Sequence, residues 1–114
     1  MGIVQEGLKV PAKVVGAATD LLIGKKPADD KVVTAVTNYI RAVDKGNLIS
    51  MKEISRGLQD VGPSDLSQQA KSRIRAEVDT ATKTVFAKYA KEGSYHPMNR
   101  EIQLFRGHVR RLTS

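Results

Sequence analysis

The sequence lacks cysteine and tryptophan, and it holds only three tyrosines and two phenylalanines. Without cysteine there are no disulfides, no thiolate nucleophile, no cysteine-based zinc ligands and no iron–sulfur ligation. Because large rings are scarce, the core has to be built from Val, Ile, Leu, Ala and Met. A core of that composition favours the packing of helices.

Long hydrophobic runs are also missing. The longest apolar stretch, residues 14–23, is broken by Asp20 and has about half the length of a membrane span. We therefore expect no transmembrane helix. No small-residue cleavage site follows the stretch, so we expect no secretory signal peptide either. The expected location is the cytoplasm, or the inside of a virion or another intracellular assembly.

Signatures of enzymes are absent as well. The chain contains no HExxH, no GxSxG, no glycine-rich dinucleotide loop and no EF-hand spacing. Its two histidines, His96 and His108, stand in different segments, and no spacing predicts that they share a metal ion. The sequence therefore predicts a protein that is not an enzyme and needs no cofactor.

Glycine and proline divide the chain into segments with the 3.6-residue period of amphipathic helices. We find no internal repeat and no linker long enough to separate domains, so residues 1–114 are expected to form one domain. The fold class predicted is all-α, a compact bundle of about five helices with one long central helix. The expected helices are residues 12–23, 28–45, 50–61, 64–91 and 97–112.

Local signals mark several helix ends. Asp29 and Asp30 suit the positive end of a helix dipole, and Gly46 suits the position just after a helix. Ser50 with Glu53 resembles a capping box, and Ser64 or Asp65 is expected to cap the long helix. Two inward-facing rows stand out: Val32, Val36, Tyr39, Ile40 and Val43, then Met98, Ile102, Phe105, Val109 and Leu112.

Positive charge dominates the second half of the chain. The net charge is +7, and residues 63–114 hold ten basic and five acidic side chains. Such a bias attracts polyanions, whether nucleic acid, anionic lipid or an acidic protein face. Charge alone does not choose among these partners.

Two groups of basic residues are the candidate binding residues. Arg100, Arg106, Arg110 and the adjacent Arg111 recur along the side of the last helix away from its apolar row. The second group lies near the start of the expected long helix and comprises Lys71, Arg73 and Arg75. Guanidinium groups suit the recognition of phosphate or carboxylate. Alternatively, the arginines only solvate an exposed helix face.

The sequence offers little support for two known modes of binding nucleic acid. Residues 51–74 read as helix, turn and helix, but Gln59 and Gln69 stand where a helix-turn-helix wants a glycine and an apolar residue. A platform for single strands needs exposed rings among basic residues. Tyr95, near Arg100, is the one candidate, and taken alone it is a weak one.

The leading functional hypothesis is a non-enzymatic binding module for an acidic macromolecule, with nucleic acid as the first candidate. The alternative is a structural or adaptor protein of a larger assembly, such as a virion or secretion complex. Its expected contacts, with other proteins or with copies of the chain in a homo-oligomer, are apolar residues off the main rows: Phe86, Leu104 and Ile3. A small helical inhibitor of a nucleic-acid enzyme fits the pattern equally well.

Overall fold

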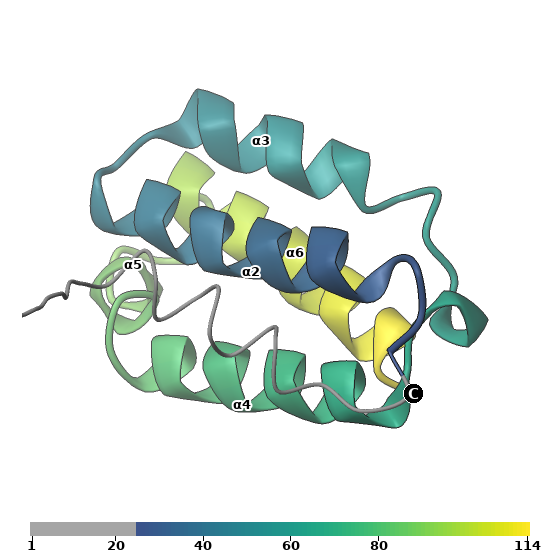
Figure 1. Cartoon of the computed structure of the whole chain (residues 1–114). Helices are drawn as coiled ribbons and strands as arrows, with labels where there is room; N and C mark the ends of the chain where they lie inside the picture. Colours follow the sequence, from purple (N-terminus) through teal and green to yellow (C-terminus); the bar gives the residue numbers. More distant parts are fainter. Residues whose placement is uncertain (1–24) are drawn as a thin grey trace, which may run out of the picture.

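The computed structural model describes residues 25–114, in which every regular element is a helix (Figure 1). The predicted all-α bundle is therefore confirmed, whereas the helix expected at 12–23 lies outside the described residues. The elements are α2 (Asp29–Asp44), α3 (Leu48–Gly57), the short 3-10 helix η1 (Pro63–Asp65), α4 (Gln68–Lys83), α5 (Ala87–Ala90) and α6 (Pro97–Leu112).

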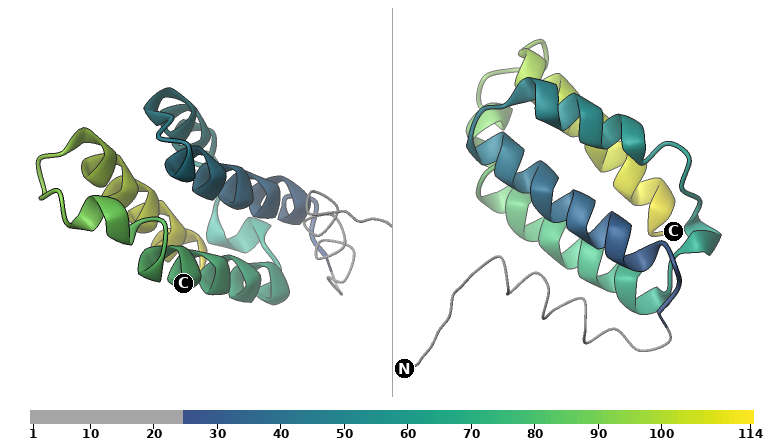
Figure 2. Two further views of the ribbon diagram at one scale, coloured as in Figure 1. Left: turned by 90° about the vertical axis from the view of Figure 1, so that its left-hand side faces the viewer. Right: turned by 45° about the horizontal axis from the view of Figure 1, so that its top comes forward.

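Four of these helices surround the core. α2 packs against α3 on one side and α4 on the other, and α6 contacts the same two helices from the opposite side of the bundle (Figures 1 and 2). α2 and α6 thus face each other across the core, while α3 and α4 close the two sides. α6 ends beside the beginning of α4, which brings Arg110 and Arg111 to the same end of the bundle as the predicted basic group of α4, whereas Arg100 lies near the other end of α6.

An aromatic cluster occupies the centre. Tyr39 of α2 stacks on Phe105 of α6 with ring centroids 3.6 Å apart, and both side chains are fully buried. Phe86 meets both rings edge-on, with centroid distances of 6.3 and 6.4 Å. Three of the five Tyr and Phe rings in the sequence therefore meet where α2 and α6 face each other.

The prediction of a single long helix over residues 64–91 is wrong. The chain first forms η1, then α4, and it leaves helical geometry at Thr84, with φ −121° and ψ −88°. The Phe86 N–H donates to the carbonyl oxygen of Ala81 at 2.8 Å, five residues back, which is a wider turn than an α-helix makes. In an unbroken helix Phe86 would point away from the apolar row. The break turns its ring into the aromatic cluster.

Helix ends follow the sequence signals in part. Gly46 has φ +71°, and the N–H of the next residue, Asn47, donates to the Ala42 carbonyl oxygen, as in a Schellman motif. The predicted role of Gly46 is confirmed. The Ser50 capping box is wrong, because Asn47 Oδ1 accepts from the Ser50 N–H and starts α3 earlier. Among the described helices, none is long and apolar enough to cross a membrane.

Candidate nucleic-acid interface

The start of α4 is fixed by a buried carboxylate. The N-cap of α4 is Ser67, not Ser64 or Asp65, and its Oγ accepts from the Ala70 N–H at 3.1 Å. The same hydroxyl donates to Asp29 Oδ2 at 2.6 Å, and the Ser67 N–H donates to Asp29 Oδ1 at 2.9 Å. Asp29 is fully buried and also accepts from the Lys26 N–H. One carboxylate thus joins the first turns of α2 and α4.

Asp29 stays ionised in this setting. Burial raises its pKa, but the hydrogen bonds from Ser67 and Lys26 and the Lys26 charge outweigh burial, so the pKa falls below its ordinary value. The sequence predicted a role at the helix dipole. It did not reveal the link to Ser67, because that contact spans 38 residues of the chain.

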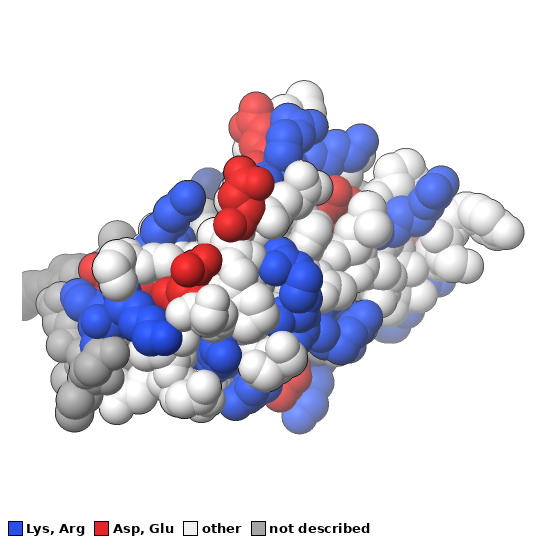
Figure 3. Space-filling model, turned by 90° about the vertical axis from the view of Figure 1, so that its right-hand side faces the viewer, with Lys and Arg blue, Asp and Glu red and all other residues white. Residues whose placement is uncertain are grey.

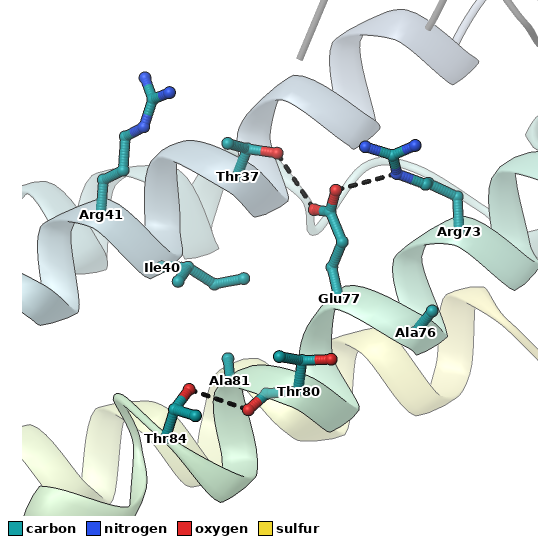
Figure 4. Close-up of a pocket in the computed structure, with 9 residues that line it drawn as sticks. All are labelled: Thr37, Ile40, Arg41, Arg73, Ala76, Glu77, Thr80, Ala81 and Thr84. Atoms are coloured by element: carbon teal, nitrogen blue, oxygen red, sulfur yellow. Dashed lines mark hydrogen bonds and ion pairs between the residues drawn. The ribbon is translucent and has the colours of Figure 1, made fainter. Parts of the chain in front are cut away.

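Two predicted binding residues are engaged within the fold. Lys71 is only 6% exposed, and its Nζ donates to the carbonyl oxygen of Ser114 at 3.2 Å. Arg73 Nε lies 2.9 Å from Glu77 Oε2, and the other oxygen of Glu77 accepts from the Thr37 hydroxyl (Figure 4). These two cations have partners in place, which makes them less available to a ligand.

The network around Glu77 borders a hollow of about 590 Å³ between α2 and α4 (Figure 4). Small side chains such as Ala76 and Thr80 line it, while the guanidinium of Arg41 points away. Arg73 is its only member from the predicted binding residues, and Glu77 holds that cation. This hollow therefore offers no free cation from the predicted binding residues to a phosphate.

Arg111 binds backbone carbonyl groups. Its guanidinium donates to Val61 O at 2.7 Å and to Leu58 O at 3.2 Å, just past the end of α3. Leu58 is the C-cap of α3 and Val61 follows it in the chain, so the contact gives these carbonyl groups a charged donor and attaches α6 to the end of α3.

Replacing Arg111 with methionine is expected to lower the free energy of unfolding by about 1 kcal/mol, because the carbonyl groups lose a charged donor while the stem of the side chain is kept. Urea unfolding measures the change. Arg110→Met is the matched control, since Arg110 contacts no carbonyl oxygen of the described residues, and it should change the stability little. Equal effects of the two variants would contradict the assigned role of Arg111.

Three predicted residues come together instead. Arg75 of α4 and Arg106 and Arg110 of α6 line a hollow of about 220 Å³ between the two helices, which we call the arginine groove. Its other lining residues are Val78, Asp79, Val109 and Thr113. On this side of the molecule Lys and Arg side chains are numerous, and several Asp and Glu side chains lie among them (Figure 3). The arginine groove is therefore a cationic feature shared by both predicted groups.

Contacts within the protein use only some of the N–H groups of the three arginines in the arginine groove. Arg75 Nη1 donates to the Thr113 carbonyl oxygen at 2.6 Å, which positions this guanidinium. Arg106 Nη1 reaches Gln103 Oε1 at 3.4 Å, a long hydrogen bond, and Arg110 is exposed. A guanidinium has five N–H groups, so each of the three can still donate to a ligand.

Arg100 lies on the opposite flank of α6. With Tyr95 and Leu104 it lines a hollow of about 250 Å³, which Lys52 of α3 also borders. Pro97 and Glu101 complete this feature, which we call the tyrosine hollow. The predicted arginine row of α6 is thus divided among the arginine groove, α3 and the tyrosine hollow.

The predicted protein contacts fare differently. The prediction that Phe86 contacts another protein is wrong, because its side chain is only 3% exposed and belongs to the aromatic cluster. Leu104 is 64% exposed. Ile3 lies outside the described residues.

Glu101 is a buried residue that the sequence analysis did not single out. Its carboxylate oxygen lies 3.0 Å from the Tyr39 hydroxyl, and the side chain is 7% exposed. Burial and the charge of Glu101 raise the pKa of Tyr39 far above its ordinary value, so the phenol remains a donor. The position was readable, since Glu101 stands three residues after Met98 and four before Phe105, at the edge of the apolar row.

One of the two histidines, His96, has a local structural role. His96 is the N-cap of α6, where its Nδ1 accepts from the Met98 N–H at 3.1 Å. In residues 25–114 no group of three or more His, Asp or Glu side chains is placed to hold a metal ion.

Comparisons with protein-family models, curated proteins and solved structures found no significant match to this chain.

Proposed function

We propose that this protein is a non-enzymatic binding module whose arginine groove engages the phosphates of a nucleic acid. The observation that supports the proposal most is the convergence of Arg75, Arg106 and Arg110 from two helices on one hollow. Bidentate contacts between guanidinium and phosphate are strong and geometrically selective. Asp79 is the one carboxylate among the lining residues, so positive charge prevails in the groove.

The outer face of α6 adds to this charge. Its acidic residue, Glu101, is buried and bonded to Tyr39, so the exposed part of α6 carries arginines and no exposed carboxylate. A polyanion that lies along α6 would meet Arg100 near one end and Arg110 near the other. Ten residues separate these two, which corresponds to about 15 Å along the helix axis. That length accommodates several phosphates of one strand.

The double variant Arg106→Gln/Arg110→Gln is expected to weaken binding to single- and double-stranded oligonucleotides at least tenfold, because two charge-assisted contacts are lost. Fluorescence anisotropy at low salt with labelled DNA and RNA measures the affinities. Arg41→Gln/Arg56→Gln is the matched control, which removes the same charge from exposed positions on α2 and α3.

The control should lose much less affinity than the groove variant. Equal losses would show that only net charge matters, and absence of binding to every oligonucleotide would contradict the proposal itself.

An adaptor role in a larger assembly is the second candidate. Ile49 and Leu104 support it, as large apolar side chains that are 72% and 64% exposed. Light scattering at moderate salt tests it, because a self-assembling adaptor forms oligomers that Leu104→Asp disrupts. A monomer at every concentration would count against contacts between copies of the chain.

A further inference from the structure

Tyr95 is the most exposed large hydrophobic side chain of the described residues, at 89%. The other two tyrosines are different: Tyr39 is fully buried and Tyr89 is partly buried against the core. Tyr95 borders the tyrosine hollow together with Lys52 and Arg100. The structure therefore places an open ring beside two cations that come from two separate helices.

We propose that the tyrosine hollow receives an unpaired base of a single-stranded nucleic acid, which stacks on Tyr95. This inference rests on the proposed function, since the arginine groove is taken to hold the phosphates of the same strand. Aromatic side chains that stack on successive bases, next to a basic track for the backbone, are the usual means of binding single strands.

The composition of the hollow favours a base over a phosphate. Tyr95, Pro97 and Leu104 give it apolar surface, and the carboxylate of Glu101, which also lines it, is buried and bonded to Tyr39. Apolar surface of this kind suits the face of a base, which stacks on aromatic and apolar side chains, better than it suits a phosphate. Lys52 and Arg100 are exposed at the same hollow and are suited to the flanking phosphates.

The tyrosine hollow is small. At about 250 Å³ the hollow is smaller than the pockets of roughly 300–1,000 Å³ that hold drug-sized ligands. Arg100 borders the hollow and is exposed, as is Arg110 near the other end of α6, while Arg106 is partly buried. A strand could therefore pass from Tyr95 along α6 to the arginine groove.

The test compares two ligands of equal length, an oligothymidylate and the same deoxyribose phosphate chain without bases. The wild-type protein is expected to bind the oligothymidylate at least fivefold more tightly, because only this ligand can stack. Tyr95→Ala should abolish the difference, and Tyr95→Phe should keep it. Ile49→Ala is the matched control, an exposed apolar residue that does not line the hollow.

A spectroscopic readout accompanies the affinities. The chain has no tryptophan, so Tyr95→Trp introduces one fluorophore at the hollow. Oligothymidylate is expected to quench this fluorescence, and the chain without bases is not. Urea unfolding of the Tyr95 variants should match the wild type, since the side chain is exposed.

Each outcome has a distinct meaning. If both ligands bind equally well and Tyr95→Ala has no effect, the stacking inference is wrong while the arginine groove keeps its proposed role. Failure of both ligands to bind at low salt would overturn the proposed function as well. If Ile49→Ala weakens binding as much as Tyr95→Ala, an extended apolar contact replaces the stacked base, which also overturns the inference.

Discussion

Replacing Phe105 with alanine is expected to lower the free energy of unfolding by about 3–5 kcal/mol. The Phe105 ring is fully buried and touches both other members of the aromatic cluster. Its removal leaves a cavity where α2 and α6 meet, and it also removes the stacking on Tyr39, worth about 0.5–1.5 kcal/mol beyond burial. Domains of this size are stable by only about 5–15 kcal/mol.

Urea denaturation followed by circular dichroism measures this loss. Tyr95→Ala is the control, because its exposed ring should contribute less than about 0.5 kcal/mol. A loss below about 1 kcal/mol for Phe105→Ala would contradict the central place of the aromatic cluster, since it lies under the usual range for buried phenylalanine.

The second large effect concerns Asp29, which holds the start of α4. Asp29→Ala is expected to cost about 3 kcal/mol or more, since each hydrogen bond to a charged group is worth about 1.5–3 kcal/mol. The substitution leaves both the hydroxyl and the N–H of the buried Ser67 without their acceptor. Asp30→Ala is the control, because Asp30 is exposed and its contact with Lys25 lies at the surface.

Asp29 also predicts a pH dependence. Its pKa in the folded protein is lower than the ordinary value of 3.8. Its contribution to stability is therefore complete above pH 3.8 and is lost as the pH falls through the lowered folded pKa. Asp29→Asn lacks this titration, so the stability difference between wild type and Asp29→Asn should shrink as the pH is lowered through that range. A constant difference would contradict the assigned hydrogen bonds.

The helix patterns of α2 and α6 were readable from the sequence because each helix buries one face. Val32, Val36, Tyr39 and Val43 are buried as predicted, and Ile40 packs at the edge of the core. In α6 the whole predicted row is buried. Gly46 was readable for a different reason, since a positive φ leaves few alternatives to glycine.

The break after α4 was not readable by the same means. Residues 64–91 keep a helical period on both sides of Thr84, and no glycine or proline marks the interruption. The helix breaks because Phe86 is buried against Tyr39 and Phe105, and this burial depends on tertiary packing. Phe86 lay off the apolar row, and the chain bends to bring it in.

The candidate site, too, could be predicted from the sequence only in part. The sequence predicted which side chains are basic, and helical spacing predicted that the arginines of α6 avoid the apolar row. It could not predict that Lys71 and Arg111 reach backbone carbonyl groups, because these contacts join segments 43 to 53 residues apart. Nor could spacing show that Arg75 meets Arg106 and Arg110. The contact between α4 and α6 determines which arginines can act together.

The salt dependence of binding tests the arginine groove most directly. Each phosphate contact with a single strand contributes about 0.7 to the slope of log K against log salt concentration. If Arg106 and Arg110 each hold one phosphate, Arg106→Gln/Arg110→Gln should have a slope smaller in magnitude by about 1.4 than the wild type, while Arg41→Gln/Arg56→Gln keeps the wild-type slope. Identical slopes for all three proteins would contradict the account.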